Sequence, residues 1–139
     1  MRDYLIMTDS CCDLSQQEVD ELGVSVLPLS FTIDGRTYLN TPDHAAMAPE
    51  DFFRRVADGA VCTTAAVNVG EFTDAMRPVL ESGRDILCIC FSSALSTTYQ
   101  SACIAADDLR GEYPEAKIIV IDSLSASRGQ GMLVYRTVQ

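Results

Sequence analysis

Hydroxyl side chains are concentrated in one short segment of the sequence, residues 92–98, where five of seven residues are serine or threonine. An apolar run precedes this segment and a helical pattern follows it, so the segment stands at the start of a helix. Hydroxyls and the unpaired backbone N–H groups of a helix start bind anions without any charged side chain. A simpler role is that Ser92, Ser93 and Ser96 only cap the helix. Five hydroxyls exceed what capping requires, so the sequence favours an anion site.

Smaller polar groups occur at three further points, Thr8-Asp9-Ser10, Thr63-Thr64 and Asp122-Ser123. The first and third each follow an apolar run typical of a buried strand, and the second precedes a helical pattern. In open α/β sheets, ligands bind beyond the carboxyl ends of the strands. We therefore expect the polar groups that follow strands to meet at one edge of a sheet.

The residue types in residues 92–100 favour a carboxylate over a phosphate as the bound anion. A phosphate-binding loop requires glycines and a lysine, and residues 92–100 contain neither. A rival interpretation is a hydrolase or acyltransferase with Ser93 or Ser96 as nucleophile, which requires a neighbouring base. The G-x-S-x-G pattern is absent, and the single histidine, His44, lies in a polar segment of the chain.

A metal site has little support in the sequence. The six cysteines include no C-x-x-C pair, and reduced thiols are the default in a reducing compartment. Asp9, Asp13 and Asp122 could ligate a divalent cation, but capping and turn stabilisation explain them better. We therefore expect no metal and no cofactor.

The elements that position these groups alternate between strand and helix. Expected strands are 4–7, 24–33 (interrupted by Pro28), 36–39, 85–91 and 117–121, and expected helices are 15–22, 49–57, 69–82, 95–109 and a segment after Ser123. Ser15 and Glu18 form a capping box, and Gly23 ends that helix. This alternation predicts an α/β domain with a mainly parallel sheet.

Composition and charge exclude several classes of partner. Lys and Arg total 10 against 20 Asp and Glu, which gives a net charge of −10 that repels nucleic acid and anionic membrane surfaces. No apolar run is long enough to span a membrane, and no secretory h-region follows Met1. We therefore expect a cytoplasmic protein. The helical pattern at residues 137–139 has no stop signal, which suggests a truncated chain.

The order and spacing of these motifs resemble the DegV family of fatty-acid-binding proteins. Residues 8–14 are similar to the family's T-D-S-x-x-D-L opening, and residues 27–29 to its following P-L strand. Residues 64–72 resemble its T-S-x-x-x-x-G-E-F segment. The most specific match is residues 92–102, which resemble S-S-x-L-S-G-T-Y-Q-S-A. Ile121-Asp122-Ser123 followed by residues 129–131 is similar to the family's next segment, so the resemblance covers the whole chain.

This resemblance implies a three-layer αβα fold over residues 1–139, the amino-terminal domain of the family, with the second domain absent. It implies a long-chain fatty acid such as palmitate as ligand and a fatty-acid kinase as partner, with no catalysis by the chain itself. By motif, Thr64 and Ser96 would bind the carboxylate. Supporting loop residues would be Ser92, Ser93, Asp9, Ser10, Asp122 and Ser123.

Three residues depart from the family pattern. Thr97 replaces the usual glycine, Ala65 replaces a serine, and Cys11 replaces a small polar residue. The change at Ala65 removes one possible hydrogen-bond donor next to Thr64.

Overall fold

The computed structural model describes residues 2–139, which form two β-sheets and five α-helices. The strands are β1 (Tyr4–Asp9), β2 (Ser25–Leu27), β3 (Ser30–Ile33), β4 (Arg36–Leu39), β5 (Cys62–Ala65), β6 (Asp85–Cys90) and β7 (Ile118–Asp122). The helices are α1 (Gln16–Leu22), α2 (Pro49–Ala57), α3 (Val69–Glu81), α4 (Thr98–Glu112) and α5 (Ser127–Val138), with a 3-10 turn η1 (Ser10–Cys12).

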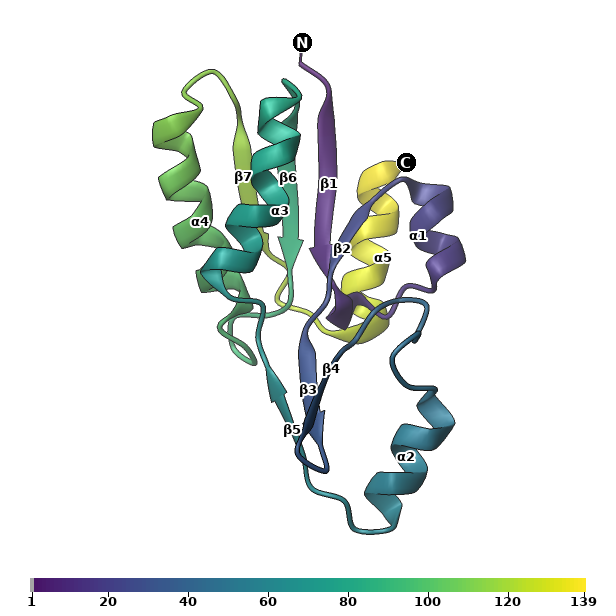
Figure 1. Ribbon diagram of the computed structural model, residues 1–139. Helices are drawn as coiled ribbons and strands as arrows, with labels where there is room; N and C mark the ends of the chain where they lie inside the picture. The colour runs from purple at the N-terminus through teal and green to yellow at the C-terminus, as the bar shows by residue number, and fades with distance from the viewer. Residues whose placement is uncertain (1) are drawn as a thin grey trace.

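The larger sheet has the strand order β2-β1-β6-β7, and all of its neighbouring strands are parallel. Helices α3 and α4 cover one face and α1 and α5 the other, which confirms the expected three-layer αβα fold (Figure 1). From β1 the chain moves to β2 in one direction, and from β6 it moves to β7 in the other. The switch point of the sheet, where α/β proteins bind ligands, therefore lies between β1 and β6.

Apolar side chains at helical spacing fill both sides of this sheet. On α3, Phe72, Met76 and Leu80 are buried at i, i+4 and i+8, so one stripe of the helix faces the strands. Helix α4 presents small residues to the same core, which allows close packing between the two helices. The opposite side is a smaller core that includes Val19 of α1 and Val134 of α5.

The smaller sheet is antiparallel, with the order β4-β3-β5, and projects beyond the carboxyl ends of β1 and β6 (Figure 1). Ser10 fastens it to the larger sheet, because its Oγ accepts a hydrogen bond from the Leu29 N–H at 2.9 Å. Helix α2 lies beside it, where Phe52 packs edge-on against Phe31 at 5.4 Å between ring centroids.

Three features of the fold differ from the expectations. β1 continues through Thr8 and Asp9, which were expected to form a turn. β5 was not expected as a strand, and it forms through long-range pairing with β3. Helix α4 begins at Thr98 and not at Leu95, because residues 92–96 form a tight turn in which the Ser92 carbonyl accepts hydrogen bonds from two backbone N–H groups.

Two further findings concern the described chain as a whole. No helix within residues 2–139 combines the length and apolar character needed to cross a bilayer. The six cysteines are free, and the Sγ atoms of Cys88 and Cys90 lie 3.6 Å apart on the buried strand β6.

We predict that Gly131→Ala destabilises the protein by about 1–3 kcal/mol, the usual cost of overpacking. A Cβ at this position would lie 2.5 Å from the Cys12 carbonyl oxygen, so the start of α5 would have to move away from η1. The free energy of unfolding from urea titration measures this effect.

Gly129→Ala on the same helix is the matched control. Its Cβ would meet only Ser125, at 3.6 Å, which is an ordinary contact. Alanine has the higher helix propensity, so this variant should be as stable as the wild type or more stable by up to about 1 kcal/mol. Equal losses in the two variants would contradict the close approach at Gly131.

Candidate functional site

The carboxylate of Asp9 joins the ends of the two central strands at the switch point. Its Oδ2 accepts a hydrogen bond from the Phe91 N–H at 2.7 Å, and its Oδ1 accepts from the Cys11 N–H at 3.1 Å. Asp9 is fully buried, and this burial raises its pKa above the ordinary value despite the hydrogen bonds, which act in the opposite direction. The Asp9 carboxylate therefore holds the backbone that follows the two central strands and does not contact solvent.

The loop of residues 92–97, which joins β6 to α4, is held at its base by the turn that follows β7. The Ser92 N–H donates to the Ser125 carbonyl at 3.0 Å, and the Ser93 N–H donates to Asp122 Oδ1 at 3.1 Å. The same Asp122 oxygen accepts from the Leu124 N–H at 3.1 Å. Asp122 therefore fastens the two strand-end loops to each other.

Ser96 places its hydroxyl at the start of α4. Its Oγ accepts a hydrogen bond from the Thr98 N–H at 3.2 Å and lies 2.9 Å from the Thr98 Oγ1. When Thr98 donates in that hydroxyl pair, the Ser96 proton is free to bind an acceptor from solvent. Ser96 is half-buried and Thr98 is fully buried, so the hydroxyl available to a ligand is that of Ser96.

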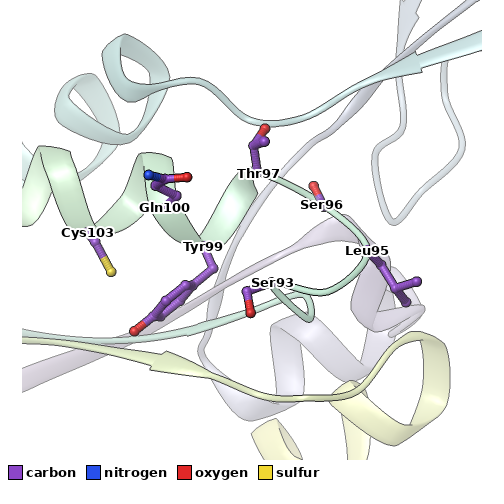
Figure 2. A pocket seen from close by; sticks show the side chains of 7 residues that line it. All are labelled: Ser93, Leu95, Ser96, Thr97, Tyr99, Gln100 and Cys103. Atoms are coloured by element: carbon purple, nitrogen blue, oxygen red, sulfur yellow. The ribbon is translucent and has the colours of Figure 1, made fainter.

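Ser96 lines an open pocket of about 640 Å³ at the amino-terminal end of α4. The side chains that line it include Ser93, Leu95, Thr97 and Tyr99 (Figure 2). In this view Ser93 and Tyr99 lie on one side of the loop, while Ser96 and Thr97 point to the other. The two serines proposed as nucleophiles therefore do not point in the same direction.

Thr64 lines a second pocket, of about 340 Å³, between the smaller sheet and α2. Thr64 and Phe31 are direct partners in the β3–β5 pairing, so their side chains share one face of that sheet. Apolar residues dominate the lining, among them Phe52 and Phe91. Cys11 also lines it, and burial raises the pKa of this thiol to about 12, so the thiol stays neutral.

The predicted site residues fall into two groups by burial. Thr64 and Ser93 are exposed and Ser96 is half-buried, so their hydroxyls can reach a ligand. The others are buried or already hydrogen-bonded to the strand-end loops: Asp9, Ser10, Ser92, Asp122 and Ser123. The structure places Thr64 and Ser96 in the linings of two different pockets that share no lining residue; Phe91, which lines the Thr64 pocket, directly precedes the Ser96 loop in the chain.

The residue that the sequence did not indicate is Gln130, on the first turn of α5. It is fully buried, and its Nε2 donates to Thr8 Oγ1 at 3.0 Å and to Asp9 Oδ1 at 3.1 Å. A glutamine between Gly129 and Gly131 carries no signal of burial, so only the fold reveals this contact. His44 is exposed and lines the Thr64 pocket, away from Ser93 and Ser96.

We predict that the two aspartates titrate on opposite sides of the ordinary aspartate pKa, about 3.9. Burial raises the pKa of Asp9, whereas the hydrogen bonds that Asp122 receives from Ser93 and from the Leu124 N–H lower the pKa of Asp122. The contribution of Asp9 to stability therefore decreases as the pH rises through its raised pKa. The contribution of Asp122 is lost as the pH falls through its lowered pKa.

Carboxyl ¹³C chemical shifts followed from pH 2 to 8 measure both midpoints. Coincident midpoints for Asp9 and Asp122 would contradict the difference in environment described above.

Solved structures of other proteins share this arrangement over nearly the whole chain. A stearic-acid-binding protein from Eubacterium ventriosum superimposes with a TM-score of 0.87 at 30% identity, covering 97% of this chain and 46% of its own. A fatty-acid-binding DegV family protein from Thermus thermophilus superimposes with a TM-score of 0.86 at 34% identity, covering 99% and 46% respectively.

Sequence relatives agree with the structural ones. A DegV domain-containing protein of Clostridium perfringens is 37% identical over 139 residues, which is 100% of this chain and 47% of the relative. The chain thus spans about half the length of the curated relatives that it matches. The family model described as "Uncharacterised protein, DegV family" matches residues 4–139. The chain belongs to the DegV family.

Proposed function

We propose that residues 1–139 form the amino-terminal domain of a fatty-acid-binding protein, in which Thr64 and Ser96 bind the carboxylate of the lipid. The observation that carries this proposal is the structural likeness to the stearic-acid-binding protein of E. ventriosum, at a TM-score of 0.87 and 30% identity. The accessibility of both hydroxyls supports it, since Thr64 is exposed and Ser96 is half-buried, although in the described domain they line separate pockets.

Neutral donors suit a ligand whose affinity comes from elsewhere. A hydrogen bond to a charged group contributes about 1.5–3 kcal/mol. Each buried methylene contributes about 0.8 kcal/mol, so a sixteen-carbon chain offers on the order of 10 kcal/mol before the costs of association. The acyl chain therefore supplies most of the affinity and the hydroxyls fix the orientation of the carboxylate. The aromatic lining beside Thr64 favours a carboxylic acid with an apolar body over a polar metabolite.

The local environment favours a carrier over a serine hydrolase. Of the residues in 2–139 that line the pocket at Ser93 and Ser96, none is a histidine or a lysine, and the neighbouring Asp122 carboxylate already accepts the backbone N–H groups of Ser93 and Leu124. A serine nucleophile needs such a base within hydrogen-bonding reach. We further propose that the full-length protein presents its bound fatty acid to a fatty-acid kinase, which forms the acyl phosphate. That role is tested by adding the purified kinase with ATP and measuring acyl phosphate.

Replacement of either hydroxyl should weaken the binding of a fatty acid. We predict that Thr64→Ala and Ser96→Ala each reduce the affinity for decanoate by about tenfold to a hundredfold, because each removes a hydrogen bond to a charged group. Decanoate is soluble as a monomer, so NMR titration of the 139-residue chain measures even weak dissociation constants.

Thr63→Ala is the matched control, since Thr63 neighbours Thr64 on β5 and its side chain points to the opposite face of the sheet. It should bind decanoate as the wild type does. Unchanged affinity in both Thr64→Ala and Ser96→Ala would exclude these residues as the carboxylate site.

The carrier and hydrolase hypotheses also predict different reactivity toward a serine-directed probe. We predict no labelling of the chain by a serine-directed fluorophosphonate probe, measured by intact-protein mass spectrometry beside a serine hydrolase as positive control. Labelling that disappears in Ser93→Ala or in Ser96→Ala would support the hydrolase and refute the carrier.

A further inference from the structure

Gln130 is a polar side chain in a position where packing alone would favour an apolar one. It is 0% exposed, and within residues 2–139 its Oε1 is buried without a hydrogen-bond partner. An unsatisfied buried acceptor is unfavourable for stability. A methionine has similar length and would fill the same space without that acceptor. The amide is therefore better explained by what its two N–H groups hold.

Both N–H groups of the Gln130 amide are engaged at the end of β1. One donates to Asp9 Oδ1, at 3.1 Å, and the other to Thr8 Oγ1, at 3.0 Å. Thr8 in turn donates to the Ile89 carbonyl on β6, at 2.7 Å. One side chain of α5 thus connects the two central strands of the sheet.

The second oxygen of Asp9 transmits this contact to the site loop. Asp9 Oδ2 accepts the Phe91 N–H at 2.7 Å, and Phe91 immediately precedes Ser92. The other oxygen, Oδ1, accepts hydrogen bonds from Gln130 and from the Cys11 N–H, so both oxygens of the Asp9 carboxylate are held and its orientation is fixed. The direction in which the chain leaves β6 depends on that plane.

Gln130 also fixes the other support of the same loop. It lies three residues after Ser127, the first residue of α5; Ser125 lies in the turn before that helix, and Asp122 is the last residue of β7. These two residues accept the N–H groups of Ser93 and Ser92. A shift of the start of α5 relative to β1 would therefore move the Ser125 support of residues 92–97, while Asp122 on β7 holds the other.

We propose that Gln130 is a positioning residue for the carboxylate site: by orienting Asp9 and by fixing the start of α5 to β1, it sets where Ser96 presents its hydroxyl. This inference rests on the proposed fatty-acid binding and adds to it a residue that touches no ligand. It accounts for a buried amide that leaves its Oε1 without a hydrogen-bond partner in the described part of the chain.

Gln130→Met tests the inference, because it keeps the length of the side chain and removes both donors. We expect the backbone amide resonance of Phe91 to move upfield as its hydrogen bond weakens, with shifts extending through residues 92–98. We expect the affinity for decanoate to fall by about threefold to tenfold, the range for loss of one hydrogen bond. The melting temperature should stay close to that of the wild type, because the variant also removes the unpaired Oε1. A purely structural role would instead change the melting temperature and leave the affinity of the folded chain intact.

Gln17→Met is the matched control. Gln17 is exposed on α1 and donates one side-chain hydrogen bond to Glu21, at 2.8 Å, far in sequence from the site loop. It should change neither the resonances of residues 91–98 nor the decanoate affinity.

The outcomes separate this inference from the proposed function. Wild-type binding of decanoate together with equal binding by Gln130→Met overturns the positioning role and leaves the carrier function in place. Unmoved resonances of residues 91–98 in Gln130→Met overturn it as well. If the wild-type chain binds decanol and decanoate equally, the carboxylate site itself fails, and the positioning role fails with it.

Discussion

A single buried carboxylate, that of Asp9, holds together the part of the molecule on which the site depends. It stands at the end of β1 and accepts the first backbone N–H beyond β6, so it ties the two strands on either side of the switch point. A buried anion is costly unless several donors surround it. Backbone N–H groups of Cys11 and Phe91 and the amide of Gln130 provide that environment, and burial still leaves the pKa of Asp9 raised. Loss of this cluster would release the loop at residues 92–97, whatever happened to the hydrophobic core.

This arrangement explains how an acidic protein can offer the carboxylate site proposed above. The chain carries a net charge of −10, which by itself repels a carboxylate. The two aspartates nearest the site are occupied, since Asp9 and Asp122 each accept backbone N–H groups of the strand-end loops. The accessible groups are neutral hydroxyl donors, chiefly those of Thr64 and Ser96. The negative charges thus build the scaffold, and the hydroxyls remain free for the ligand.

Sequence patterns predicted the elements whose signals are local. The capping box of Ser15 and Glu18, the left-handed Gly23 and the Pro49 helix start all appear as expected, because each depends on a few neighbouring residues. Strand β5 was missed because its residues, Cys62–Ala65, become a strand only through pairing with β3. The start of α4 was placed three residues too early, since hydroxyls that can cap a helix can equally close a turn before it. The family motifs indicated Thr64 and Ser96, but no local pattern could indicate Gln130, whose partners lie more than a hundred residues away.

Affinity and orientation are supplied by different parts of such a site, and this separation has a physical consequence. Charged partners would hold a lipid carboxylate more tightly, but a protein that presents its ligand to a kinase, as proposed above, must also release it. Hydroxyl donors give up the carboxylate at a cost of a few hydrogen bonds, about 1.5–3 kcal/mol each. Water replaces them directly, because Thr64 is exposed and Ser96 is only half-buried. In the proposed site, directional accuracy must then come from the backbone beneath these hydroxyls, and the hydrogen bonds of Asp9 to Gln130 and to the Phe91 N–H hold that backbone.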